Sequence, residues 1–135
     1  MEDCIFCKII KGDIDSVKVY EDDEVLAFLD AFPDTEGHSL IVPKQHFENI
    51  FDIDSHILQK IVVVGQNLAI KMRQSLGAIG VHLANNNGKG AEQIVHHFHL
   101  HVIPRYEDDG LKMYGPRDKS KPASEELKKI AEKLK

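Results

Sequence analysis

Histidine recurs at every second position of one short segment, His97-Phe98-His99-Leu100-His101. Alternate side chains of a β-strand share a face, so the three imidazoles are expected on one face and their apolar neighbours on the core side. An imidazole is a competent nucleophile toward phosphorus near neutral pH, and neighbouring groups can fix its tautomer and take up a proton. The pattern therefore predicts a histidine that attacks a phosphate.

The residues just before this segment favour the same chemistry. Residues 85–90 read Asn-Asn-Asn-Gly-Lys-Gly, and backbone amides at such glycines can approach an anion closely. Two other interpretations of the histidines remain open, a merely polar strand face and a metal site made by the strand alone. The second is disfavoured because alternate positions lie about 6.6 Å apart, whereas zinc ligands lie about 2.0–2.1 Å from the metal.

The only two cysteines, Cys4 and Cys7, form a Cys-x-x-Cys motif near the start of the chain. In a cytosolic protein this spacing indicates metal or redox chemistry more often than a structural disulfide. A zinc finger would add two histidines three to five residues apart, and that spacing does not accompany this pair. Spacing alone thus leaves a zinc site and two free thiols as equal alternatives.

Composition bounds the class of protein. The chain has 135 residues, of which 42% are hydrophobic, and a net charge of −5 with histidine neutral. These values predict a single domain over residues 1–135, and the acidic balance argues against a nucleic-acid partner. No apolar run approaches the roughly 20 residues of a membrane span, and the N-terminus does not resemble a secretory signal. We therefore expect a cytoplasmic protein with no membrane partner.

Hydrophobic periodicity predicts the elements that position these residues. The clearest helix covers 55–76, with a short helix at 5–11 and an amphipathic terminal helix at 124–134. Strands are expected at 17–20, 25–29, 39–42, 79–84 and 97–103, the last ended by Pro104. The polar tail 106–122 is expected to be loosely held. This order predicts an α+β fold, an antiparallel sheet of about five strands with the helices on one side.

Several ordered blocks together resemble the histidine triad (HIT) family of nucleotide hydrolases and transferases. The signature is His97 through Pro104. The other blocks are Ile5–Ile10, Tyr20–Asp23, Ala27–Asp30, His38, Ile41–His46, Asn86 and Gln93–His97. The resemblance covers residues 4–105 and implies a HIT-like fold.

The resemblance also implies roles for individual residues. His99 falls at the nucleophile that attacks an α-phosphate, and His101 and His38 fall at positions that donate hydrogen bonds to the phosphate oxygens. Asp30 falls at the ribose position, while Asn86 and Gln93 lie on the phosphate side. The apolar residues of the family's base and ribose pocket correspond to Phe6, Ile9, Ile14, Phe28, Ala31 and Leu40. Each of these apolar residues is equally compatible with a plain core position.

For the cysteine pair, the resemblance implies a structural zinc ion, one per chain, held by Cys4, Cys7, His46 and His97. It also implies a homodimer that uses the helix 55–76 and a sheet edge. One departure is Ile94, where similar members often carry serine or threonine. The family's preference for a leaving group therefore does not carry over to this chain. The tail also lacks the tryptophan-containing ending of some members, because the chain has no tryptophan.

Two functions follow as hypotheses. The first is a nucleotide phosphohydrolase or nucleotidyltransferase that forms a nucleotidyl-histidine on His99, with a purine nucleoside phosphoramidate or dinucleoside polyphosphate as substrate. The second is a purine-nucleotide-binding regulatory module with little turnover. Loss of hydrolysis with retained nucleotide binding in His99→Ala would distinguish the first from the second.

Overall fold

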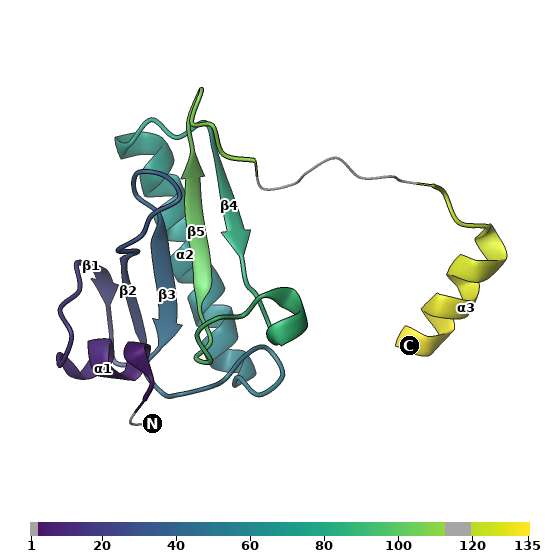
Figure 1. Ribbon diagram of the computed structural model, residues 1–135, viewed down its shortest axis with the longest axis horizontal. Helices are drawn as coiled ribbons and strands as arrows, with labels where there is room; N and C mark the ends of the chain where they lie inside the picture. Colours follow the sequence, from purple (N-terminus) through teal and green to yellow (C-terminus); the bar gives the residue numbers. More distant parts are fainter. Residues whose placement is uncertain (1–2, 113–119) are drawn as a thin grey trace.

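The computed structural model describes residues 3–112 and 120–135, and its centre is a five-stranded antiparallel sheet in the order β1-β2-β3-β5-β4 (Figure 1). The strands are β1 (Lys18–Glu21), β2 (Val25–Leu29), β3 (Ser39–Pro43), β4 (Gly80–Ala84) and β5 (Leu100–Arg105). The helices are α1 (Ile5–Lys11), α2 (Ser55–Ser75), the short 3-10 helix η1 (Lys89–Ala91) and α3 (Ser124–Leu134). The α+β prediction is confirmed.

The two faces of the sheet are covered by different helices. From β2, Val25 and Ala27 pack in one apolar cluster with residues of α2, such as Ile61. Leu26 and Phe28 point the other way and pack with residues of α1 in a second cluster. The prediction that the helices lie on one side is wrong for α1, because β2 and β3 are apolar on both faces and both faces need cover.

Helix α2 lies across the sheet over β5 and β3. Asp54 begins the helix by accepting hydrogen bonds from the amides of His56 and Ile57. Gly65 permits the close approach, since a Cβ atom there would lie 3.3 Å from a methyl carbon of Leu100. The packing fixes β5, and with it the end of the histidine segment, against this helix.

Strand β5 begins and ends later than its sequence predicts. It starts at Leu100, so His97 and His99 lie in the extended segment that leads into it. Pro104 does not end the strand but pairs with Val81 of β4. Strand β3 pairs with β5 only as far as Val102, so at Pro104 the strand has one neighbour and tolerates the missing amide proton.

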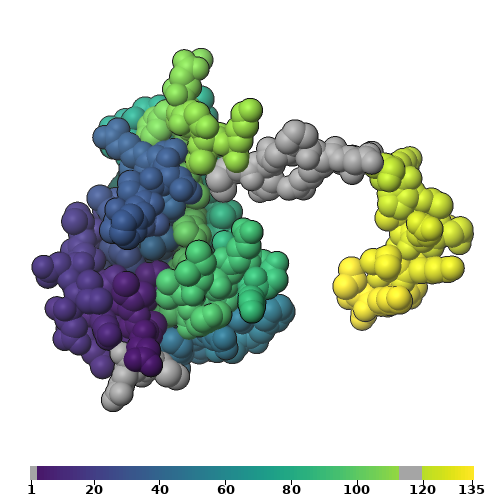
Figure 2. Space-filling view, viewed as in Figure 1, coloured from purple at the N-terminus to yellow at the C-terminus, as the bar shows by residue number. Residues whose placement is uncertain are grey.

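The first residues after β5 are hydrogen-bonded to the rest of the domain, whereas the C-terminal helix is exposed. The prediction of a loose tail over 106–122 is wrong for its first residues, because Arg105 forms two hydrogen bonds to the Asp109 carboxylate and Tyr106 donates to the Glu36 carbonyl. Residues 113–119 lie outside the described residues. The helix α3 follows where predicted, and none of its residues is buried (Figure 2). Within the described residues, no helix is both long and apolar enough to cross a membrane.

Candidate functional site

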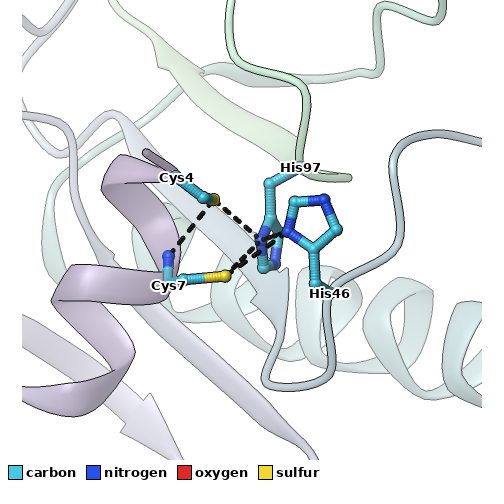
Figure 3. Close-up of side chains that lie close together, drawn as sticks. All are labelled: Cys4, Cys7, His46 and His97. Atoms are coloured by element: carbon cyan, nitrogen blue, oxygen red, sulfur yellow. Dashed lines mark hydrogen bonds between the residues drawn. The ribbon is translucent and has the colours of Figure 1, made fainter. Parts of the chain in front are cut away.

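Four side chains from three separate parts of the chain meet at one end of the sheet (Figure 3). Cys4 and Cys7 come from the start of α1, His46 follows β3, and His97 precedes β5. Nδ1 of His97 lies 3.3 Å from Sγ of Cys4, 3.6 Å from Sγ of Cys7 and 3.1 Å from Nδ1 of His46. Sγ of Cys7 lies 3.4 Å from Nδ1 of His46.

These distances fit a tetrahedral metal site. With zinc bonds of about 2.3 Å to sulfur and 2.0–2.1 Å to nitrogen, the edges of the tetrahedron are about 3.3–3.8 Å long. The Nε2 of His97 lies 2.8 Å from the carbonyl oxygen of Pro43, which can only accept, so Nε2 carries the proton and Nδ1 offers a lone pair. Burial lowers the pKa of His97 to about 4, which keeps the imidazole neutral. The cluster can hold a metal ion through two thiolates and two imidazoles.

A hollow of about 450 Å³ opens beside this cluster, on the face of the sheet that α1 covers. Its wall combines apolar side chains with two carboxylates, an amide and two imidazoles. The lining residues are Ile5, Phe6, Ile9, Phe28, Asp30, Ala31, Phe32, Leu40, Asn86, Glu92, Ile94, Val95, His99 and His101. Nine of the residues that the sequence proposes for substrate or catalysis therefore lie together.

His99 presents one ring nitrogen without a proton to this hollow. Its Nδ1 lies 2.8 Å from the carbonyl oxygen of His97, so Nδ1 donates and Nε2 keeps its lone pair. Burial lowers the pKa of His99, and the hydrogen bond to the His97 carbonyl opposes that shift only in part. The backbone is also held, because the side-chain amide of Asn85 donates to the His99 carbonyl at 2.9 Å. The ring is thus neutral and held in one orientation, with the lone pair of Nε2 available to a ligand in the hollow.

His101 has the opposite tautomer, fixed by a chain of hydrogen bonds. The backbone amide of Asp34 donates to Nδ1 of His38 at 3.0 Å, so the proton of His38 sits on Nε2. That Nε2 lies 2.9 Å from Nδ1 of His101, which must accept, and Nε2 of His101 is therefore the protonated nitrogen. Burial lowers the pKa of His101 to about 4. Its Nε2–H can serve as a donor to a ligand in the hollow.

Three residues proposed from the sequence do not line the hollow. His38 is 3% exposed and acts behind His101, where its Nε2 also lies 3.6 Å from the Asp30 carboxylate. The side-chain amide of Gln93 forms hydrogen bonds with the backbone. It donates to the carbonyls of Glu48 and Val95 and accepts from the amide of Gly88. Ile14 lies outside the wall and is 37% exposed.

Sequence reasoning did not propose several residues that the structure brings to the site. Ile5, Phe32, Glu92 and Val95 line the hollow, and Asn85 holds the backbone of His99. Asn85 carried a signal because it opens the run of three asparagines before the glycines, and Ile5 and Val95 lie inside family blocks named above. The other four belong to loops or helix ends, where no periodicity marks the inward side.

Comparison with known proteins places this architecture in a family. Residues 11–108 match the HIT domain. A HIT family protein from Bacillus anthracis is 43% identical, with a TM-score of 0.88 over 98% of this chain and 95% of that one. A Zn-bound histidine triad family protein from Mycobacterium smegmatis is 39% identical, with a TM-score of 0.79 over 87% and 85%. A histidine triad nucleotide-binding protein from Candida albicans is 36% identical, with a TM-score of 0.84 over 98% and 94%. The chain belongs to the HIT family.

Proposed function

We propose that this protein is a nucleotide hydrolase or nucleotidyltransferase that attacks the α-phosphate of a purine nucleotide with Nε2 of His99. The observation that carries the proposal is the pairing of tautomers in one hollow. A ring nitrogen with a free lone pair on His99 stands beside a protonated ring nitrogen on His101. The ring centroids of the two histidines lie 5.0 Å apart in an edge contact, so that one phosphate in the hollow would be within reach of both rings.

The hollow, called the nucleotide hollow below, has groups suited to the base, the ribose and the phosphate of a nucleoside monophosphate, one after another along its wall. The apolar end, with Phe6 and Phe28 in edge contact at 5.7 Å between ring centroids, suits the base. The Asp30 carboxylate accepts from the Phe32 amide through Oδ1 and keeps Oδ2 for ribose hydroxyls. Asn86 and His101 then face the phosphate. Ile9, Ala31 and Leu40 complete the apolar wall, and Gln93 holds the loop that carries Asn86.

The reaction proceeds in two displacements. In the first, a bond forms between Nε2 of His99 and phosphorus while the bond from phosphorus to the leaving group breaks, and the leaving group takes a proton from solvent while Nε2–H of His101 donates a hydrogen bond to it. The negative charge on the phosphate oxygens is stabilised by hydrogen-bond donors already in place. In the second, water attacks phosphorus and gives up a proton to solvent, and the bond from phosphorus to His99 breaks to release the nucleoside monophosphate.

The metal cluster has a structural role in this proposal. Cys4, Cys7, His46 and His97 would hold one zinc ion per chain, and four protein ligands leave no open position for a substrate or water. The Zn-bound relative supports the choice of metal. Zinc would tie the start of α1, which carries Phe6, to the segment that carries His99. Thiols kept reduced for zinc favour a cytoplasmic location.

His99→Ala tests the proposed reaction. Hydrolysis of a purine nucleoside phosphoramidate or a dinucleoside polyphosphate should fall at least about 1,000-fold, while nucleoside monophosphate affinity changes less than about threefold. His56→Ala is the matched control, because His56 is exposed near the start of α2 and belongs neither to the lining of the nucleotide hollow nor to the candidate metal cluster. If wild type binds nucleotide but turns over neither substrate class, the alternative of a regulatory binding module replaces this one.

We also propose that the protein is a homodimer. Strand β4 is an edge strand of the sheet, and its backbone groups can pair with an edge strand of a second copy of the chain. Exposed apolar residues on that edge and on the outer side of α2 extend the surface, namely Val62, Val63, Ile70, Ile79 and Leu83. Sedimentation equilibrium should give twice the chain mass for wild type and the monomer mass for Val63→Lys combined with Leu83→Lys. A monomeric wild type would contradict this assembly.

A further inference from the structure

The carbonyl oxygen of His99 lies just beyond the paired part of β4 and β5. The last pair between these two strands joins Ala84 and His101. The next residue after β4 is Asn85, and its side-chain Nδ2 donates to the His99 carbonyl at 2.9 Å. A side-chain amide therefore holds the backbone of the proposed nucleophile at the point where strand pairing stops, and this contact depends on which way the amide is turned.

The direction of the Asn85 amide is set by Asn87. An asparagine amide turned by about 180° keeps its shape but presents an acceptor oxygen where it presented a donor nitrogen. Turned in this way, Asn85 would place Oδ1 against the His99 carbonyl oxygen, and two acceptors cannot share a hydrogen bond. Nδ2 of Asn87 opposes this rotation, because it donates to Oδ1 of Asn85 at 2.5 Å. The Nδ2 of Asn85 is thus kept toward His99.

The direction of the Asn87 amide is set in turn by the backbone. The backbone N–H of Ile50, which can only donate, lies 2.7 Å from Oδ1 of Asn87. The Nδ2 of Asn87 is therefore left to face Asn85. The hydrogen bonds run from the Ile50 amide through both asparagine side chains to the His99 carbonyl. Because this chain has a backbone donor at one end and a backbone acceptor at the other, neither side chain can turn without losing a hydrogen bond.

The segment 47–52, in which this chain of hydrogen bonds begins, also contacts the histidine segment directly. The carbonyl of Phe47 accepts from the backbone amide of Phe98 at 2.7 Å. The Asp52 carboxylate fixes the shape of the segment by accepting from the backbone amides of Glu48 and Asn49 at 3.0 and 2.9 Å. The backbone around the proposed nucleophile is thus held from one segment by two routes, one direct and one through the two asparagines.

We propose that Asn85 and Asn87 form a one-way amide relay that positions His99 for attack, so that both are positioning residues for the reaction. The proposal rests on the function proposed above and deepens it. Asn86 lies between them in the chain and lines the nucleotide hollow, so the relay fixes the phosphate-side amide together with the attacking ring. Neither Asn85 nor Asn87 is among the residues that line this hollow, so their loss affects the rate of attack more than nucleotide affinity.

The test is a double-mutant cycle on the full chain. In Asn87→Asp the new carboxylate still accepts from the Ile50 amide but turns an oxygen toward Oδ1 of Asn85. With an adenosine phosphoramidate as substrate, kcat should fall about 10- to 50-fold and KM should stay within about twofold. Asn85→Ala should lower kcat by a similar factor. In the Asn85→Ala background, Asn87→Asp should lower kcat by less than about twofold more, because the relay is already broken.

The cycle separates the relay from other effects of the substitution. Repulsion between the new carboxylate and the phosphate, or a general loss of packing, would act in both backgrounds. An equal effect of Asn87→Asp with and without Asn85 would therefore overturn the relay. Asn67→Asp is the matched control, since it makes the same exchange of amide for carboxylate at an exposed position of α2. Its kcat should stay within about 1.5-fold of wild type.

A second measurement does not depend on turnover. Hydrogen exchange of the Asn85 side-chain amide, followed by NMR, should be at least about tenfold faster in Asn87→Asp than in wild type, because its Oδ1 has lost the donor. Asn67→Asp should leave this exchange unchanged. Unchanged exchange in Asn87→Asp would overturn the relay whether or not the protein is a hydrolase. If wild type turns over neither substrate class, the proposed function fails, while faster exchange in Asn87→Asp still supports the relay.

Discussion

Two histidine clusters share the segment 97–101 and use the same side chain in opposite ways. In the metal cluster, one nitrogen of His97 faces three potential ligand atoms at 3.1–3.6 Å. At the nucleotide hollow, Nδ1 of His99 and Nδ1 of His101 each have one hydrogen-bond partner, and that partner decides which nitrogen of the ring carries the proton. A single proton cannot serve three neighbours, whereas a metal ion can. The convergence of donor atoms therefore separates a metal ligand from a catalytic histidine more clearly than residue type does.

The two clusters meet at one peptide carbonyl. The side chain of His97 belongs to the metal cluster, while its backbone oxygen accepts the proton of His99 Nδ1 at 2.8 Å. The candidate metal cluster and the orientation of His99 are thus connected through the backbone of one residue. Substitutions on either side of this carbonyl can separate the two roles.

The largest effect is expected from Cys4→Ser, which removes one thiolate from the candidate metal cluster. Bound zinc should fall from one ion per chain to less than about 0.1, and the free energy of unfolding should fall by at least about 3 kcal/mol, because metal binding stabilises only the folded chain. Elemental analysis and urea unfolding measure the two quantities. His96→Ala is the control, and equal zinc in Cys4→Ser and wild type would refute the site.

His38→Ala should have the next largest effect and acts only on the nucleotide side. Without Nε2–H of His38, His101 loses the partner that places its proton, so kcat should fall about 30- to 100-fold with KM within threefold. Zinc content should stay at one per chain. Nitrogen NMR of His101 should show a mixture of tautomers in the variant, and an unchanged Nε2–H tautomer would contradict the relay.

Acid stability gives a smaller, pH-dependent effect. The pKa of His101 is lowered to about 4, below the ordinary value of 6.5, so the unfolded chain binds more protons between these values. The free energy of unfolding should therefore fall as pH falls from 6.5 to 4. For this group the loss should be about 2 kcal/mol, less than full linkage because the ring is partly accessible.

His101→Asn should reduce that slope, as measured by urea unfolding at each pH. The comparison is best made in a Cys4→Ser background, where acid release of metal no longer contributes. An equal slope with and without His101 would show that other groups cause the acid sensitivity.

His46→Ala should have the smallest effect on turnover, and it tests whether zinc binding can be lost without losing the reaction. The variant should lose zinc as Cys4→Ser does, yet kcat should fall only about fivefold. The Nε2 of His97 still donates to the Pro43 carbonyl at 2.8 Å, so the His97 backbone and its acceptor for His99 keep their place. A loss of turnover as large as that of His99→Ala would mean that the two clusters are not separable.

Much of the fold was predictable from local pattern. The strand 25–29 and the helix α2 are predicted within one residue, because the alternation of side chains and the three- to four-residue period are local properties. The start of β5 was not, since His97 turns toward α1 and His46 before pairing begins. The position of α1 on the face opposite α2 also lies beyond local pattern, because it depends on which strands become central in the sheet.

The sequence by itself determined which side chains are available: two thiols, an alternating run of histidines, and the family blocks around them. Only the tertiary structure decided what each histidine does. The partners of His97 and His101 lie 51 to 93 positions away in the chain, and these partners place the protons on the rings. A tautomer is fixed by the acceptor or donor that packing brings within about 3 Å, and no local sequence pattern specifies that neighbour.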